Sequence, residues 1–127
     1  MRPVYFKRFD FEVGTALSTV SKEFEIDKDV HVVNGLLLTA DQEDQLYFRG
    51  SQSITVNGVE LFPDGYGSRL LMSGLGVPPD KRYYSIGRVE TINGKIRIVF
   101  TDTESLMIGF SPYKVSLYVR GLRKPLT

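Results

Sequence analysis

Two segments of the chain alternate between apolar and polar residues on either side of an Asn-Gly dipeptide. Residues 53–62 place Asn57-Gly58 between two such runs, and residues 89–100 place Asn93-Gly94 in the same way. An Asn-Gly pair supplies the two positive φ angles of the tight turn that joins antiparallel strands. Each segment is therefore predicted to form a two-residue β-hairpin.

The turns also set the expected register, which sorts apolar side chains onto one face and most polar side chains onto the other. The second hairpin adds an opposite-charge pair on its solvent face. The expected pairs are Val56–Val59, Ile54–Leu61 and Thr55–Glu60 in the first hairpin, and Val89–Ile98, Thr91–Ile96 and Glu90–Arg97 in the second.

Alternation and enrichment in β-branched and aromatic residues predict further strands. The segments 41–44, 63–67 and 74–80 are acidic or rich in Gly and Pro, so they are expected to be loops. No segment fits a helix of ordinary length. The additional expected strands are Val4–Phe11, Leu17–Ile26, Val30–Thr39, Gln45–Arg49, Arg69–Ser73, Tyr83–Ile86, Ser105–Phe110 and Tyr113–Arg120.

About ten short strands predict an all-β fold, a single-domain antiparallel β-sandwich of jelly-roll-like type. The 127 residues allow one hydrophobic core, so residues 1–127 are expected to form one domain. Hydrophobic residues make up 42% and charged residues 24%, which excludes disorder as the overall state. No apolar run approaches the roughly 18 residues of a spanning helix, and no secretory signal is recognised. The chain is expected to be made and folded in the cytoplasm.

The residue types needed for common catalytic sites are scarce. The absence of cysteine excludes disulfides, thiolate metal sites and cysteine nucleophiles. The single histidine, His31, fits a hydrogen-bonded strand residue better than a general base, because no partner nucleophile is indicated. Gly74-Leu75-Gly76 resembles a phosphate loop only in part, since Pro78-Pro79 block a following helix. The chain is expected not to be an enzyme, with no catalytic residue, cofactor or metal.

Charge is distributed unevenly along the chain. Residues 1–8 carry three bases and no acid, and residues 114–127 carry four bases and no acid. Residues 9–113 hold all fifteen acids and nine bases, a net charge of −6. Both ends are therefore basic and the body is acidic, which favours contacts between oppositely charged surfaces.

The two ends also carry the candidate interface residues. Val4–Phe11 has apolar or aromatic residues on both faces, which indicates burial against another subunit or, equally well, a central strand of the sandwich. In Tyr113–Arg120 the basic residues and one tyrosine share a face that could follow a nucleic-acid backbone, meet an acidic neighbour or guard a solvated edge. Residues 1–13 are a candidate interface arm and residues 121–127 a basic tail. The candidate interface residues are Tyr5, Phe6, Phe9, Phe11, Lys114, Tyr118, Arg120 and Arg123.

Short strands, Gly- and Pro-rich loops, charged ends and an aromatic N-terminal segment resemble, in architecture, the small β-sandwich and jelly-roll proteins of virus and phage particles. This resemblance implies a non-enzymatic structural protein of a virion, a capsid-type subunit that contacts copies of itself or other assembly subunits. Nucleic acid is a weaker candidate partner. The alternative is a cytoplasmic carbohydrate-binding β-domain that uses Tyr66, Tyr83 and Tyr84.

Overall fold

The structure is a computed structural model that describes residues 4–73, 77–78, 81–91 and 94–124, with only the backbone described for residues 63–66. Within these residues the chain forms eight strands, one α-helix and one 3-10 helix. Their order is β1 (Val4–Val13), β2 (Thr19–Glu25), β3 (Val30–Ala40), α1 (Glu43–Arg49), β4 (Gly50–Val56), β5 (Val59–Gly67), η1 (Ser68–Leu71), β6 (Tyr84–Glu90), β7 (Lys95–Asp102) and β8 (Tyr113–Arg123).

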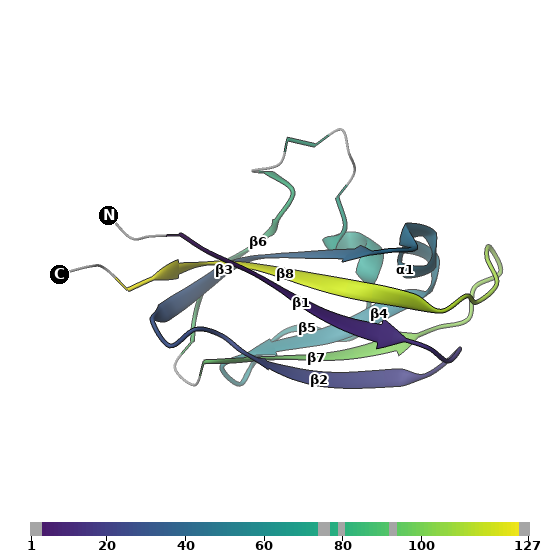
Figure 1. Cartoon of the computed structure of the whole chain (residues 1–127), viewed down its shortest axis with the longest axis horizontal. Helices are drawn as coiled ribbons and strands as arrows, with labels where there is room; N and C mark the ends of the chain where they lie inside the picture. Colours follow the sequence, from purple (N-terminus) through teal and green to yellow (C-terminus); the bar gives the residue numbers. More distant parts are fainter. Residues whose placement is uncertain (1–3, 74–76, 79–80, 92–93, 125–127) are drawn as a thin grey trace.

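The strands form two four-stranded antiparallel sheets that pack face to face (Figure 1). Sheet A has the strand order β1-β8-β3-β6, and sheet B has the order β2-β7-β4-β5. The pairing is nested, because β1 pairs with β8, β2 with β7, β3 with β6 and β4 with β5. The expected all-β sandwich is confirmed, with eight strands in the described residues instead of about ten.

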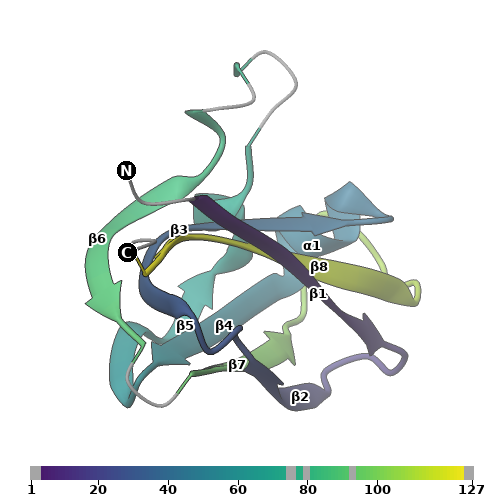
Figure 2. The same ribbon diagram turned by 60° about the vertical axis from the view of Figure 1, so that its left-hand side comes forward.

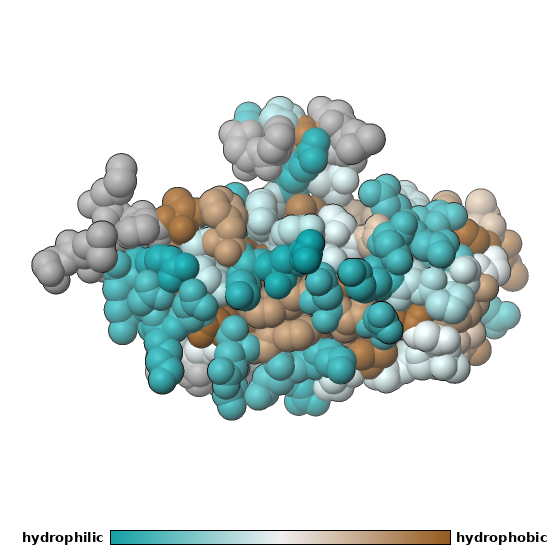
Figure 3. Space-filling view, in the orientation of Figure 1, coloured by the Kyte–Doolittle hydropathy of each residue, from teal (hydrophilic) through white to brown (hydrophobic). Residues whose placement is uncertain are grey.

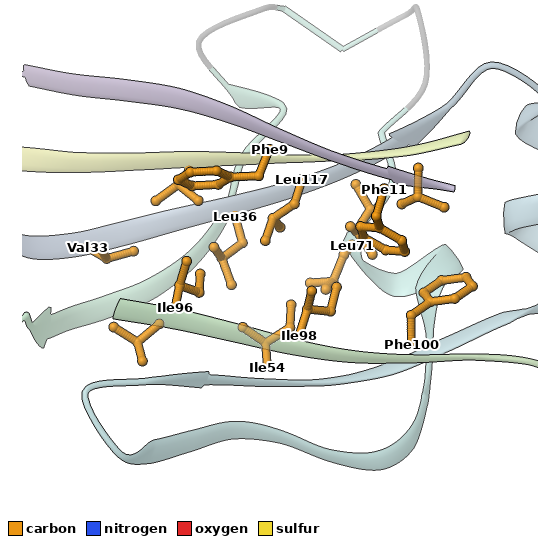
Figure 4. Packing of buried hydrophobic residues seen from close by; sticks show 14 of the residues in the cluster. Phe9, Phe11, Val33, Leu36, Ile54, Leu71, Ile96, Ile98, Phe100 and Leu117 are labelled. Carbon is orange, nitrogen blue, oxygen red and sulfur yellow. The ribbon is translucent and has the colours of Figure 1, made fainter. Parts of the chain in front are cut away.

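The core lies between the sheets and is built from alternate residues of their strands. Figure 4 shows Phe9, Phe11 and Leu117 of sheet A facing Ile98 and Phe100 of sheet B. The Phe11 and Phe100 rings meet edge to face, with centroids 5.4 Å apart. Burial of such large apolar side chains is the main driving force for this fold.

The first predicted hairpin is confirmed. Asn57 and Gly58 have φ angles of 53° and 74°, which is the backbone geometry of the expected turn. Val56 pairs with Val59 and Thr55 with Glu60 as expected, but Ile54 pairs with Phe62 and not with Leu61. A β-bulge at Leu61 causes this difference, since it adds one residue to β5 without a partner in β4.

The second predicted hairpin is wrong, although Gly94 has the positive φ of 65° that the turn requires. The strands on either side of residues 92–93 belong to different sheets, because β6 pairs with β3 whereas β7 pairs with β2 and β4. Val89 lies opposite Val33, and Ile98 lies opposite Ile54. The chain therefore crosses from sheet A to sheet B between β6 and β7, with Gly94 in this connection, while Asn93 lies outside the described residues.

Four other local predictions are also corrected. Residues 45–49 form most of α1, and residues 69–71 belong to η1, where strands were expected. Residues 105–110 are irregular, and residues 63–67 continue β5 where a loop was expected. Pro63 is tolerated there because β5 is an edge strand, which leaves one side of its backbone without ladder hydrogen bonds.

A buried polar cluster holds α1 and the loop between β7 and β8 against the end of the sandwich. Arg49 Nε and Nη2 donate to the two carboxylate oxygens of Asp102 at 3.1 and 2.8 Å. The Tyr113 hydroxyl and the Leu17 N–H also donate to this carboxylate, at 2.8 and 2.9 Å. Burial alone raises the pKa of Asp102, but the hydrogen bonds from Arg49, Leu17 and Tyr113 outweigh it and hold that pKa below its usual value.

Two further contacts of α1 fix the same loop. The Gln45 side chain donates to the Gly109 carbonyl at 2.8 Å and accepts from the Ser111 N–H at 3.1 Å. The Arg49 carbonyl accepts hydrogen bonds from the Thr103 N–H and hydroxyl. The inward face of α1 is therefore fully engaged, which leaves its outward face to solvent. None of the helices in the described part of the chain has the length and hydrophobicity needed to cross a bilayer.

Candidate interaction surface

β1, the strand that carries the predicted aromatic arm, lies at a free edge of sheet A. Its side chains alternate between the core and the solvent. Tyr5, Phe9 and Phe11 point into the sandwich and are buried, whereas Phe6 points away from the core and is 61% exposed. Val4 shares the outer face with Phe6. Of the four aromatic residues of β1 expected at an interface, only Phe6 is thus available on the surface.

Phe6 belongs to a cluster of side chains on the outer face of sheet A. Strand register places Phe6 of β1 opposite Arg120 of β8. The Phe6 ring lies 6.0 Å from the Tyr83 ring, and Arg120 Cζ lies 5.2 Å from the centre of the Tyr83 ring. Tyr118 lies on the same face of β8 as Arg120 and interacts electrostatically with Tyr83. We call Phe6, Tyr83, Tyr118 and Arg120 the outer platform.

Arg120 lies flat on the sheet because the residue beneath it is a glycine. A Cβ atom at Gly35 would come within 2.8 Å of Arg120 Nη2. Arg120 Nε donates to the Asn34 side-chain oxygen at 2.9 Å, and Nη2 donates to the Asn34 carbonyl at 3.4 Å. These contacts fix the guanidinium in the plane of the platform, which is the geometry that favours stacking on an aromatic ring.

The charge of Arg120 is not neutralised by an acid within the described residues. Arg120 forms no ion pair there, and its Nη1 group donates no hydrogen bond. Burial raises the pKa of the neighbouring Tyr83, an effect that the charge of Arg120 partly offsets. The platform therefore presents aromatic surface together with a fixed positive charge that has free N–H donors.

The other basic residues of β8 do not extend this surface into a stripe. Arg123 donates to Asp29 at 2.6 Å and to Asp27 at 3.2 Å, and it lies over the Tyr5 ring. Lys114 is exposed, but six residues separate it from Arg120, a distance of roughly 20 Å along a strand. A nucleic-acid backbone would meet isolated positive charges here and not a continuous basic track.

Two of the three tyrosines of the alternative carbohydrate-binding hypothesis, Tyr83 and Tyr84, lie on different faces. Tyr83 lies in the outer platform, whereas the Tyr84 ring packs against Phe62 of sheet B, with centroids 5.6 Å apart. Tyr66 lies in β5 opposite Gln52, and its side chain is outside the described part of the structure. Consecutive residues of an extended chain point to opposite faces, which explains the separation of Tyr83 and Tyr84.

His31 lines a separate pocket of ≈ 340 Å³ together with Lys28, Val30, Glu90, Thr91 and Lys124. The Thr91 hydroxyl, the nearest hydroxyl in this pocket, donates to the Val30 carbonyl at 2.6 Å. The Thr91 N–H donates to the His31 carbonyl. Thr91 is thus engaged in joining β3 to the end of β6, and this pocket offers no other hydroxyl nucleophile among its lining residues.

Sequence reasoning placed Tyr118 and Arg120 on the polar face of their strand, but it left open which face of Val4–Phe11 is outward and did not find Asn34 and Gly35. A glycine within an apolar strand often marks a close approach by another group, and Asn34-Gly35 interrupts the run from Val30 to Leu38 in this way. The sequence analysis also assigned Tyr83 to the carbohydrate-binding hypothesis and Arg120 to the subunit interface, so the two residues were not considered together. The chain matches no protein-family model, and no curated protein matches it.

Proposed function

We propose that this chain is a structural subunit of a protein assembly and that the outer platform is one of its contact surfaces. The observation that carries the proposal is Phe6, which is 61% exposed on an edge strand and packs against Tyr83 beside the unpaired charge of Arg120. Aromatic residues and arginine are the types enriched in interface cores. An exposed phenylalanine beside such residues gains most of its burial only when a partner covers it.

The free edge of β1 gives the partner a second means of attachment. β1 is ten residues long, and the side of its backbone that faces away from β8 has no strand beside it in sheet A. Such an edge can extend its sheet by pairing with a strand of another chain. The platform begins on this strand, so a partner strand along β1 would also cover Phe6.

The nested strand pairing supports the finer assignment of a jelly-roll fold and, with it, a capsid-type role in a virion assembled in the host cytoplasm. Eight strands in two antiparallel sheets, with first paired to eighth and fourth to fifth, is the connectivity of a double Greek key. Jelly rolls also occur in lectins and enzymes, so the assembly role depends on the platform and not on the fold. Nothing in the proposal requires a catalytic residue, metal or cofactor.

The substitution Phe6→Ser is expected to shift the wild-type association equilibrium toward monomer and to leave the β-structure intact. Removal of the exposed ring deletes apolar contact area from the interface and little from the core. The measurement is light-scattering mass across a concentration series, with circular dichroism as the check on folding. Val59→Ser is the matched control, because Val59 is also an exposed apolar strand residue but lies on β5, at the far edge of sheet B.

The two variants together separate the outcomes. Loss of association in Phe6→Ser with wild-type association in Val59→Ser supports the platform as a contact surface. Equal association in both variants would place the contact elsewhere. A wild-type chain that stays monomeric at every concentration would exclude self-assembly, and the remaining partner would be a different subunit.

A further inference from the structure

A second exposed apolar surface lies at the α1 end of the sandwich. Tyr47 and Phe48 occupy consecutive positions of α1, are 47% and 40% exposed, and meet edge to face with centroids 4.9 Å apart. Two adjoining hollows of ≈ 340 and ≈ 300 Å³ flank these rings and share Tyr47, Phe48 and Arg69. Leu70 of η1, also exposed, lines the second hollow. We call this surface, between α1 and η1, the end groove.

The end groove carries acidic charge that no base among the described residues neutralises through an ion pair. Glu43 and Asp44 line the first hollow and form no ion pair with any described residue. Arg69 is the one base among the residues that line the groove. The first hollow therefore has two carboxylates against one guanidinium, beside exposed aromatic rings. This combination suits a partner that brings an apolar ring together with a positive charge.

The groove is held in place by the rest of the fold. On the inward side of α1, Leu46 is buried in the core and Arg49 is bound to Asp102, while Gln45 is fixed to the β7–β8 loop. The outward residues Tyr47 and Phe48 are thus presented on a helix that cannot turn without breaking buried contacts. A preorganised surface of this kind loses little conformational entropy when a partner binds.

The outer platform carries an apolar ring together with a positive charge, which is the combination that suits the end groove. Phe6 offers an exposed ring, and Arg120 offers a guanidinium that forms no ion pair with an acid in the described part of the chain. The two surfaces share no residue. Figure 1 shows α1 at the end of the molecule opposite the start of β1, Figure 2 shows α1 on the side away from β6, and hydrophobic residues are visible toward both ends in Figure 3. One copy of the chain cannot bring its own two surfaces together.

We propose that the occupant of the end groove is the outer platform of a second copy of this chain. Phe6 of one copy inserts beside Tyr47 and Phe48 of the next, and Arg120 faces Glu43 and Asp44. The inference rests on the proposed assembly function and adds to it the type of contact. Because two different surfaces meet, the contact is heterologous and each copy keeps one free surface. Repetition of such a contact produces a ring or an open filament, not a closed two-fold dimer.

The test uses two variants, each of which lacks one surface. Phe6→Ser removes the exposed ring of the platform, and Phe48→Ser removes a ring of the groove. Each variant alone is expected to be monomeric by light scattering at concentrations where the wild type assembles. An equimolar mixture is expected to form a species of twice the 14.4 kDa chain mass and no larger one, because only one intact platform and one intact groove can meet. Circular dichroism confirms that each variant is folded.

Each of the other possible outcomes contradicts the inference and identifies which part of it is wrong. If Phe48→Ser assembles like the wild type, the groove is not part of the contact, and the proposed assembly function still stands through the platform. If both variants are monomeric and their mixture is too, an intact platform on one copy does not bind an intact groove on another, and the inference is wrong. A monomeric wild type overturns the inference together with the proposal that copies of the chain are partners.

A charge-reversal pair provides a second measurement that does not depend on aromatic residues. The double substitution Glu43→Lys and Asp44→Lys is expected to weaken assembly at least about tenfold, because lysines would then face Arg120. A mixture of that variant with Arg120→Glu is expected to restore assembly beyond a heterodimer, because the native charge pairing and the reversed charge pairing can then alternate between the two variants. The absence of restored association, with both variants folded, would contradict the proposed facing of Arg120 and the two carboxylates.

Discussion

Asp102→Ala is expected to lower the free energy of unfolding by about 3–5 kcal/mol, the usual cost of removing one partner from a buried ion pair. The Arg49 and Asp102 side chains are 5% and 0% exposed, so water cannot replace the lost carboxylate around the guanidinium. The Tyr113 hydroxyl and the Leu17 N–H lose their acceptor in the same substitution. Unsatisfied buried donors add to the cost. For a domain with a total stability of about 5–15 kcal/mol, this is a large fraction.

Equilibrium unfolding in urea, followed by circular dichroism, measures this effect. Asp10→Ala is the matched control, because Asp10 is a surface carboxylate that pairs with Arg8 at 3.4 Å and accepts from Ser116. Exposed pairs contribute about 0–1 kcal/mol, so the control is expected to stay near wild type. Equal losses in the two variants would contradict a special role for the buried cluster.

The same measurement across pH tests the assignment of the charge on Asp102. Its pKa in the folded state lies below the ordinary value of 3.8. The stabilisation is therefore present above pH 3.8 and is lost as the pH falls through the folded-state pKa. The wild type is expected to lose stability in that acidic range more steeply than Asp102→Ala. If the free energy of unfolding falls equally steeply with acidic pH in the two proteins, other carboxylates account for the loss of stability.

The features that sequence reasoning predicted correctly are those set by local chemistry. Alternation in Tyr113–Arg120 separated the apolar face of β8 from its polar face, and alternation in Val4–Phe11 separated the two faces of β1 without showing which one is inward, because side chains of a strand alternate irrespective of which strand lies beside it. The turn at Asn57-Gly58 was correct for the same reason, since its two positive φ angles depend only on those residues.

The features that were wrong depend on contacts between distant segments. Asn93-Gly94 carries the same dipeptide as the confirmed hairpin, but β6 and β7 find better partners in opposite sheets. Tyr47 and Phe48 favour a strand by propensity, yet α1 forms because Leu46 fills the core and Arg49 reaches Asp102, 53 residues away. A sequence pattern within a few residues does not predict a contact with a residue so far along the chain.

The candidate surface was predictable in part for the same physical reason. Strand alternation placed Tyr118 and Arg120 on the polar face of β8, but it did not show that Phe6 faces outward or that Phe6 and Arg120 share a row across β1 and β8. The meeting of Tyr83 with this row requires the pairing of β3 with β6, which no local pattern encodes. The end groove was missed altogether because the helix that presents it was predicted as a strand.

Phe9→Ser is expected to lower the free energy of unfolding by about 3–5 kcal/mol, the usual cost of truncating a buried phenylalanine. Phe9 is 8% exposed and stacks on Phe24 of β2 with ring centroids 4.6 Å apart, so it closes the side of the sandwich where the edge strands of the two sheets meet. Urea unfolding is the measurement, and Phe6→Ser, three residues away on the outer face of the same strand, is the matched control.

The contrast between these two substitutions separates stability from assembly. Phe6→Ser is expected to change the unfolding free energy by no more than about 0.5 kcal/mol, as surface substitutions usually do, while it weakens association. Phe9→Ser is expected to weaken association only where it also unfolds the chain. A stable Phe9→Ser variant that fails to assemble would place Phe9 at the subunit contact and would contradict the division of β1 into a core face and a partner face. If β1 is divided in this way, its inward residues stabilise the core and its outward residues contact a partner. A partner can then bind at the free edge of β1 without disturbing the core.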